Sequence, residues 1–353
     1  MAKINHFDLR LQQISPDLIL KLAQIDEIKG QWIAGVRLHP QTLNQLKRSV
    51  LITSSGSSTR IEGAKISDEE LEKMLQGLKI DKFSDRDKQE ALGYYELLEN
   101  IFNSWKNLKF SESAIKHLHK ELLKYVEKDE HHRGDYKKTE NRVEMFDDRG
   151  KSIGIIFSPT PAYLTPKEMQ ELVSWTEKAL LGKKYHPLLI IGNFIVEFLK
   201  IHPFQDGNGR ISRILTNFLF LKSGYLYVEY VSHEKLIEDN KAGYYLALRK
   251  SQKSFKTADE NISPWLDFFL DIFLRQSKSA LELLANEDME KILSEKQLAV
   301  WHFLNSVDEA SPSEISEKTK VARPTVNQAL DKLLKLKKME KIGMGRSTRY
   351  RIR

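Results

Sequence analysis

The chain has 353 residues and a net charge of +7, contains no cysteine, and 41% of its residues are hydrophobic. Such a composition supports packed cores in two or three domains and excludes a disordered chain. It also excludes disulfides and thiolate metal sites, and no apolar run approaches the roughly 20 residues of a membrane span. We therefore expect a cytoplasmic protein that does not enter a membrane.

The first informative stretch is residues 51–67, which read LITSSGSSTRIEGAKIS. If Ser58 to Glu62 form one helical turn, the Ser58 hydroxyl and the Glu62 carboxylate lie on one face of it, and Gly63 is placed to end the helix. Composition alone favours a capped surface helix whose glutamate is solvated.

Helices and one hairpin are expected next. Residues 68–127 carry Leu and Ile among charged residues at the spacing of amphipathic helices. His117 and His119 lie in this region, and because no partner ligand stands at helical spacing from either, we expect structural roles for both. Residues 140–157 contain NRVEMF and SIGIIF separated by DDRGK, which predicts a β-hairpin. An isolated hairpin is marginally stable, so this one must pack against the helices.

The chain is organised around residues 202–213, HPFQDGNGRISR, which follow a long apolar run at 188–201. The spacing of that run predicts a buried helix. Pro203 disfavours helical backbone in the residue before it, so we expect His202 at the helix end, on a turn where its ring can face a pocket.

The turn after His202 has the composition of an anion site. Gly207 and Gly209 flank Asn208. Glycines allow positive φ and a close approach of the backbone to a ligand, so that successive N–H groups can point at an anion. A second helix is expected to begin near Arg210, and its free N–H groups favour phosphate there.

Charged side chains complete this cradle. Arg210 and Arg213 share a helix face, and guanidinium groups bind phosphate oxygens in a bidentate manner. Asp206 adds a carboxylate, which is understandable if a divalent cation bridges it to phosphates. The stretch therefore predicts a nucleotide polyphosphate site with a histidine base and one metal-binding carboxylate.

These twelve residues match every position of the Fic family signature, H-[FP]-x-x-[DE]-G-N-G-R-x-x-R. The chain resembles the Fic-domain adenylyltransferases, or AMPylators, over nearly its whole length. The resemblance implies a mainly α fold, with a Fic-type helical core, a small β-hairpin flap and a C-terminal winged helix-turn-helix domain. It also implies transfer of AMP from ATP to a Tyr, Ser or Thr hydroxyl of a protein, including the enzyme itself.

In that reaction His202 is the expected general base, because an imidazole accepts a proton near neutral pH. Asp206 is expected to hold Mg²⁺, with Mn²⁺ as an alternative, and Phe204 to fix the loop by packing. The residues expected to bind ATP through the signature are Asp206, Gly207, Asn208, Gly209, Arg210 and Arg213, with the Asn208 amide and the turn N–H groups at the α-phosphate.

The resemblance changes the interpretation of Glu62. The string STRIEG, beginning at Ser58, matches the Fic inhibitory motif [ST]-x-x-x-E-[GN], here in an N-terminal inhibitory helix expected at about 54–63. In relatives of this class the glutamate pairs with the second signature arginine, Arg213. The pair would occupy the guanidinium that holds the γ-phosphate, so ATP could bind but in a pose unfit for transfer.

Two other segments gain a role by the same resemblance. The hairpin at 140–157 corresponds to the flap that covers the active site and aligns the target by strand addition, with a decorative loop as the alternative. Tyr244 and Tyr245 either belong to the core or stack on the nucleotide base.

Residues 294–353 have the layout of a winged helix, and they carry 13 Lys or Arg against seven Asp or Glu, which is about +6 of the net +7. This concentration favours nucleic acid, while protein docking or dimerisation is the alternative. Residues that could reach base edges or phosphates are Arg323, Thr325, Asn327, Gln328, Arg346 and Arg349.

The expected division is an N-terminal helical region at 1–110, a Fic core at 111–276, a connector at 277–293 and a winged helix at 294–353. We expect a homodimer, by resemblance. Two other functions stay open: a DNA-binding regulator whose Fic core senses nucleotide, and a Fic relative that removes AMP or transfers another phosphate-containing group.

Overall fold

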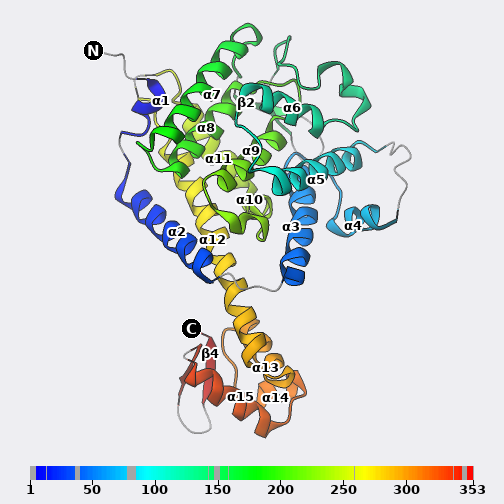
Figure 1. The fold of residues 1–353 in the computed structure, drawn as a ribbon, viewed down its shortest axis with the longest axis vertical. Helices are drawn as coiled ribbons and strands as arrows, with labels where there is room; N and C mark the ends of the chain where they lie inside the picture. Colours follow the sequence, from blue (N-terminus) through cyan, green and yellow to red (C-terminus); the bar gives the residue numbers. More distant parts are fainter. Residues whose placement is uncertain are drawn as a thin grey trace. The chain divides into compact units, whose positions relative to one another are not determined.

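The computed structural model describes residues 5–12, 14–35, 40–77, 85–141, 143–146, 152–157, 159–257, 259–336, 338–343 and 348–352. The chain divides into two compact units, Met1–Ala280 and Leu281–Arg353 (Figure 1). No helix in the described ranges is long and apolar enough to cross a bilayer.

The larger unit is built almost entirely of helices. In chain order these are α1 (His6–Leu9), α2 (Pro16–Gly35), α3 (Pro40–Ile61), α4 (Asp68–Gly77), α5 (Arg86–Ser104), α6 (Glu112–Leu122), α7 (Thr165–Gly182), α8 (Pro187–Ile201), α9 (Asn208–Lys222), α10 (His233–Asp239) and α11 (Lys241–Gln252), with the short 3₁₀ helices η1 (Glu127–His132), η2 (Ala162–Leu164) and η3 (Leu226–Glu229). The next helix, α12 (Ser263–Ile292), is continuous, so the predicted connector at 277–293 lies almost wholly within it.

The centre of this unit is α8, which packs against α7, α9 and α11 (Figure 1). Its residues 188–199 are buried on every face, as expected for a helix that is apolar all round. Pro187 occupies its first turn, where a missing N–H costs nothing, and the helix ends at Ile201, as the His-Pro pair predicts. The following helix, α9, begins at Asn208, two residues before the predicted start at Arg210.

The predicted inhibitory helix is only the end of a longer one. The sequence places it at about 54–63, whereas α3 runs over 22 residues from Pro40 to Ile61 and packs against α5 and α10. Small residues such as Ser54, Ser55 and Ser58 are buried in it, which lets neighbouring helices come close. Gly63, with φ of 103°, ends the helix as predicted.

The predicted hairpin is confirmed in its two strands. Strand β1 (Val143–Phe146) pairs in an antiparallel manner with β2 (Ser152–Phe157), and Val143 lies opposite Phe157. The register shifts twice along the pair, which marks β-bulges or similar irregularities. The DDRGK turn falls outside the described residues.

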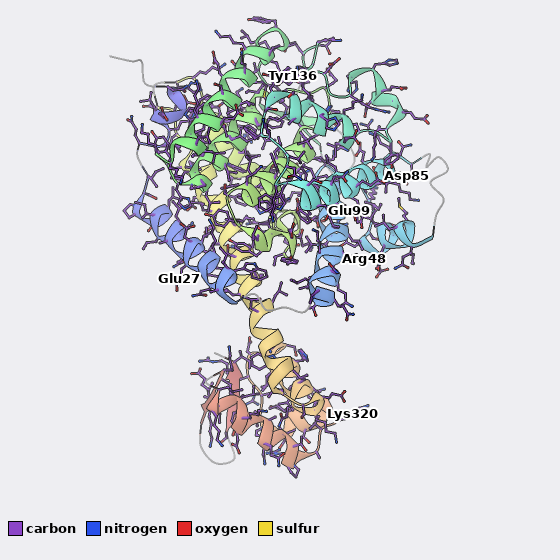
Figure 2. The ribbon with its side chains drawn as sticks, viewed as in Figure 1. Glu27, Arg48, Asp85, Glu99, Tyr136 and Lys320 are labelled. Atoms are coloured by element: carbon purple, nitrogen blue, oxygen red, sulfur yellow. The ribbon has the colours of Figure 1, made fainter. Side chains whose placement is uncertain are left out.

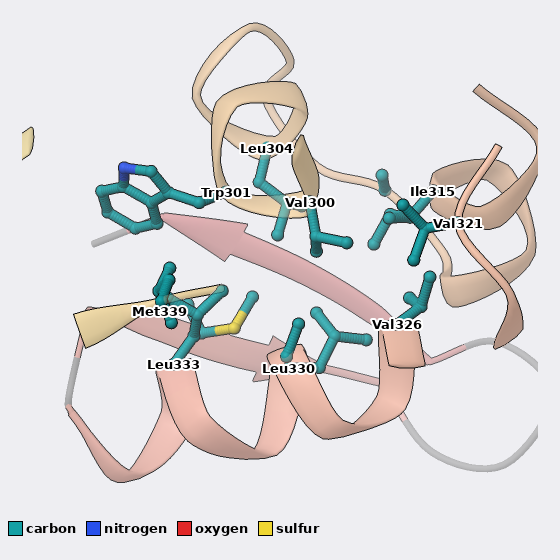
Figure 3. Packing of buried hydrophobic residues seen from close by; sticks show 12 residues of the cluster. Val300, Trp301, Leu304, Ile315, Val321, Val326, Leu330, Leu333 and Met339 are labelled. Atoms are coloured by element: carbon teal, nitrogen blue, oxygen red, sulfur yellow. The ribbon is translucent and has the colours of Figure 1, made fainter. Parts of the chain in front are cut away.

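The smaller unit has its own core. Helices α13 (Glu295–Asn305), α14 (Pro312–Thr319) and α15 (Arg323–Lys335) precede the antiparallel strands β3 (Met339–Ile342) and β4 (Arg349–Ile352). Figure 3 shows how Trp301, Leu304, Ile315, Leu330 and Met339 meet between these elements. Three helices followed by a hairpin form a winged helix-turn-helix, so the predicted fold class is confirmed for both units.

Leu330, which is 1% exposed, gives a test of this separate core. We expect Leu330→Ala to lower the stability of the smaller unit by about 2–5 kcal/mol, because it leaves a cavity in a close-packed cluster. Hydrogen exchange of the full chain should show faster exchange in α13 to α15 and unchanged exchange in α8. Gln328→Ala, at an exposed position of the same helix, is the control. Equal acceleration in α8 would contradict two independent cores.

Candidate active site

His202 ends α8 in a left-handed backbone conformation, with φ of 52°. That conformation costs a residue with a Cβ about 1–2 kcal/mol, so surrounding contacts must hold it. The ring Nδ1 donates to the Leu199 carbonyl at 3.2 Å, which leaves the basic lone pair on Nε2. Burial lowers the pKa of His202 to about 4, so the ring is neutral and able to accept a proton at pH 7.

The loop after His202 is held by aromatic and polar contacts with His119. Phe204 is fully buried and stacks on His119, with ring centroids 3.7 Å apart and planes 4° from parallel. Nδ1 of His119 accepts from the Gly134 N–H at 2.9 Å, so its Nε2–H donates to the Asp206 carbonyl at 3.0 Å. The structural roles expected for Phe204 and His119 are confirmed.

The two glycines of the signature serve different purposes. Gly207 has φ of 76° and precedes α9, as expected. Gly209 is helical, so its freedom of φ is not used. A Cβ at Gly209 would lie 2.1 Å from Oε1 of Glu62, so any larger residue would displace the Glu62 carboxylate from its present position.

The Asn208 side chain is occupied by the loop. Its Oδ1 accepts from the Phe204 N–H at 2.9 Å, and its Nδ2 donates to the Phe204 carbonyl at 2.8 Å. The amide therefore fixes the loop in this structure, whereas the sequence analysis assigns it to the α-phosphate. That role stays a prediction.

Asp206 lies in a group of charged side chains that sequence analysis found only in part. Its carboxylate meets Arg86 Nη2 at 2.5 Å and Arg210 Nη2 at 3.3 Å, and it accepts from the Gly207 N–H. Burial opposes the charged form, but Arg210 and this N–H outweigh it and lower the pKa of Asp206. Arg210 is itself buried and pairs with Glu90 at 2.6 Å.

A divalent cation fits this arrangement only as part of a nucleotide complex. In the part of the chain that the structure describes, no three His, Cys, Asp or Glu side chains are grouped to hold a metal. Mg²⁺, however, is often bound by one or two carboxylates together with substrate phosphates, and Asp206 offers one. Arg86 would have to release that carboxylate. The Arg86 side chain is 46% exposed and also contacts Glu90 and Asp129. It would therefore still be paired after releasing Asp206.

The second signature arginine pairs with the inhibitory motif. Arg213 is 2% exposed, its Nε donates to Ser58 Oγ at 2.8 Å, and its Nη2 donates at 2.8 Å both to the Ser58 carbonyl and to Glu62. Burial opposes the charge, yet Glu62 raises the pKa of Arg213. The ion pair that the family resemblance implies is therefore present.

One cavity of about 430 Å³ lies beside the loop and Glu62, and Arg213 is not part of its lining. It is lined by Thr59, Glu62, Gly63, Ala64, Arg86, Asp87, Glu90, Asn141, His202, Gln205, Asp206, Gly207, Asn208, Gly209 and Arg210. Tyr244 and Tyr245 are absent from this lining. Tyr244 is buried against Trp265, and the Tyr245 hydroxyl donates to the Ile61 carbonyl at 3.2 Å. Contact of either tyrosine with a nucleotide stays a prediction.

Comparison with known families agrees with the signature and the fold. Residues 109–220 match the model of the Fic/DOC family, and residues 293–353 match the C-terminal domain of the DIP2311-like transcriptional regulators. The match identifies residues 109–220 as a Fic domain. The fold of the chain resembles that of a Fic family protein from Desulfovibrio desulfuricans, with a TM-score of 0.62, 22% identity and 97% of each chain covered. A Fic domain containing signaling protein from Bacteroides thetaiotaomicron has a TM-score of 0.61 and 22% identity, over 74% of this chain and 98% of that one.

Two curated relatives share parts of the sequence. A probable protein adenylyltransferase from Aquifex aeolicus is 28% identical over 233 residues, which cover 61% of this chain and 63% of the relative. The protein adenylyltransferase Fic from Aedes aegypti is 36% identical over 63 residues, 17% of this chain and 13% of the relative. The chain thus spans less than two thirds of the length of either relative.

Several residues at the site could not be predicted from the sequence. Arg86 and Glu90 come from the first turns of α5, where Asp85, labelled in Figure 2, is the N-cap. Their spacing of four residues predicts a pair on one helix face, but nothing local relates that face to Asp206. Lys137 and Asn141, which contact the backbone around His202, also gave no signal in the sequence.

Burial of His119 against the loop should make the unfolding free energy depend on pH. Burial lowers the pKa of His119 to about 4, whereas an unfolded histidine titrates near 6.5. Unfolding then takes up a proton between these values, so the unfolding free energy should fall as pH falls from about 6.5 to about 4. His119 contributes at most about 1.4 kcal/mol per pH unit.

Urea unfolding at a series of pH values measures this slope. His119→Gln should reduce it by about one proton relative to wild type. His117→Gln, at an exposed position of the same helix, is the matched control. An identical slope in wild type and His119→Gln would show that His119 is not the titrating group.

Proposed function

We propose that this chain is a protein adenylyltransferase, which transfers AMP from ATP to a side-chain hydroxyl of a protein. The observation that carries the proposal is the neutral His202 ring at the edge of the cavity, in one loop with the N-terminus of α9 and Arg210. The names of the two curated relatives support the same activity.

The chemistry uses these groups in sequence. The acceptor oxygen attacks the α-phosphorus of ATP, its proton passes to Nε2 of His202, and the bond from the α-phosphorus to the bridging oxygen breaks to release pyrophosphate. Negative charge develops on the phosphates. The N–H groups at the start of α9 and the guanidinium of Arg210 belong to residues that line the cavity, where they would stabilise that charge.

A divalent cation, Mg²⁺ or Mn²⁺, would be held by Asp206 and would neutralise charge on the phosphates when bound. For this the Arg86 side chain would release Asp206 and keep its contacts with Glu90 and Asp129. Self-modification and a homodimer belong to the same proposal. So does alignment of the target protein along the hairpin by strand addition.

Glu62 is the proposed restraint on transfer. Its carboxylate accepts from Arg213 and fills the space above Gly209, so it occupies both a guanidinium and volume that the end of the polyphosphate needs. A charge-assisted hydrogen bond contributes about 1.5–3 kcal/mol, so its loss should raise the rate by about tenfold to a hundredfold. A function in removing AMP would also use this glutamate and is the alternative within the enzyme class.

The test compares ATP labelled with ³²P at the α- or the γ-position, incubated with Mg²⁺ and wild type, Glu62→Gly or His202→Ala. We expect protein-bound label from the α-position alone, increased in Glu62→Gly. His202→Ala should lose about 10²–10⁴-fold, the usual contribution of a general base. Glu69→Gly, at an exposed glutamate of α4, is the control.

Each other pattern of label contradicts one part of the proposal. Label from the γ-position would indicate a kinase-like relative. Equal label in wild type and Glu62→Gly would show that Glu62 does not restrain transfer. Full activity in His202→Ala would show that His202 is not the base. No label from either position would favour the second function below.

The second function that we propose is DNA binding by the smaller unit. The match to a transcriptional regulator domain supports it, and so does the charge of about +6 after residue 294. Helix α15 buries Val326 and Leu330 and exposes Arg323, Asn327 and Gln328. The second helix of a helix-turn-helix is the one that enters the major groove. Arg346 lies outside the described residues.

A band-shift titration of the full chain on duplex DNA tests this function. The affinity should fall steeply with salt, with a slope of log K against log salt of about −0.9 for each phosphate contacted. Arg323→Ala and Asn327→Ala should weaken binding, while Glu317→Ala, exposed on α14, should not. Unchanged affinity in the first two variants, or no binding at low salt, would favour protein docking by this unit.

A further inference from the structure

The backbone around His202 is bonded at four successive carbonyls by two residues from the segment that leads into β1. Lys137 Nζ donates to the Ile201 carbonyl at 3.1 Å, and the Lys137 backbone N–H donates to the Pro203 carbonyl at 2.9 Å. Asn141 Nδ2 donates to the His202 carbonyl at 3.4 Å and to the Phe204 carbonyl at 3.0 Å. Every carbonyl from Ile201 to Phe204 is thereby engaged.

The two donors also hold each other. Lys137 Nζ donates to Oδ1 of Asn141 at 2.8 Å, which orients the amide so that its Nδ2 faces the loop. Lys137 is 4% exposed, and no carboxylate in the described ranges forms an ion pair with it. A buried ammonium is expensive unless it is hydrogen-bonded. Here its partners are carbonyl and amide oxygens, and one of them belongs to the negative end of the α8 dipole.

We propose that Lys137 and Asn141 are positioning residues, which hold His202 in its left-handed backbone conformation and so aim its ring at the cavity. The proposal rests on the proposed role of His202 as the base. A residue with a Cβ leaves the left-handed region readily unless its neighbours determine the conformation. Hydrogen bonds at four successive carbonyls supply that determination, and the carbonyl of His202 itself is one of them.

The Lys137 charge has a second effect on the same ring. Burial is the main cause of the lowered pKa of His202, and the neighbouring ammonium adds to it by disfavouring the imidazolium. Lys137 thus helps to keep the His202 ring neutral as well as oriented. Because residues 137–141 continue into β1, the base and the hairpin share one support.

The test is made with Glu62→Gly as the parent, so that transfer is fast enough to measure. Lys137→Met in this parent should lower the rate of AMP transfer at saturating ATP by about tenfold to a hundredfold, as expected for a displaced base. The dissociation constant of ATP, measured by calorimetry, should stay within about twofold, because Lys137 is not part of the lining of the cavity. In histidine-labelled protein, the ring signals of His202, assigned by their loss in His202→Ala, should shift.

Two variants serve as controls, one for general damage and one for the loss of the buried donor. Lys138→Met removes the adjacent lysine, whose side chain is 82% exposed, and should match the parent in every measurement. Lys137→Arg keeps a buried donor and should retain more activity than Lys137→Met. If Lys137→Met does not fold, Asn141→Ala replaces it, because it removes the donor to two of the four carbonyls at a half-buried position.

The proposal is overturned if Lys137→Met and Asn141→Ala keep the rate and the His202 ring signals of the parent. It is also overturned if the rate falls through a loss of ATP affinity while the ring signals stay unchanged. If the parent transfers no AMP at all, the proposed function is wrong. The ring signals then decide alone whether this segment positions His202.

Discussion

Burying an irregular loop in the middle of a helical unit imposes the constraint on which the site depends. Between the end of α8 at Ile201 and the start of α9 at Asn208, only the ends of the backbone keep helical partners: the His202 N–H donates to the Phe198 carbonyl, and the Gly207 carbonyl accepts from the Ile211 N–H. Buried backbone groups without hydrogen bonds are costly, so partners must come from other elements. His119, Lys137, Asn141 and Asn208 all serve this need. The loop can therefore be rigid without being regular, and rigidity is what a base and an anion cradle require.

A second principle is the balance of charge around the cavity. Arg86, Arg210 and Arg213 face Glu62, Glu90 and Asp206 at hydrogen-bond distance. Without a polyphosphate, the carboxylates satisfy guanidinium groups that burial would otherwise leave at a high cost. Under the proposed function, a polyphosphate would compete with these carboxylates for the guanidinium groups. The proposed restraint and substrate binding would then be alternative ways of pairing the buried guanidinium groups of Arg210 and Arg213.

Sequence reasoning found those parts of the site that are local in the chain. The His-Pro pair placed His202 at a helix end, and Gly63 placed the end of α3, because both effects act between neighbouring residues. The resemblance to the Fic family was needed to relate Glu62 to Arg213, which are 151 residues apart. Arg86 and Lys137 could not be found, since nothing in their local sequence indicates that tertiary packing brings them to the loop. The positive φ expected of Gly209 is not adopted, and its contact with Glu62 could not be predicted, because Glu62 is distant in the sequence.

The close approach of Glu62 to Gly209 means that two proposed functions favour a small residue at position 209. The proposed nucleotide site favours a small residue there, because phosphate can then come near the backbone. The proposed restraint also favours one, because the Glu62 carboxylate can then occupy the same space. Both demands select the same amino acid. A glycine at residue 209 would therefore serve the proposed restraint and the proposed nucleotide site at once, so a larger residue there is expected to affect both.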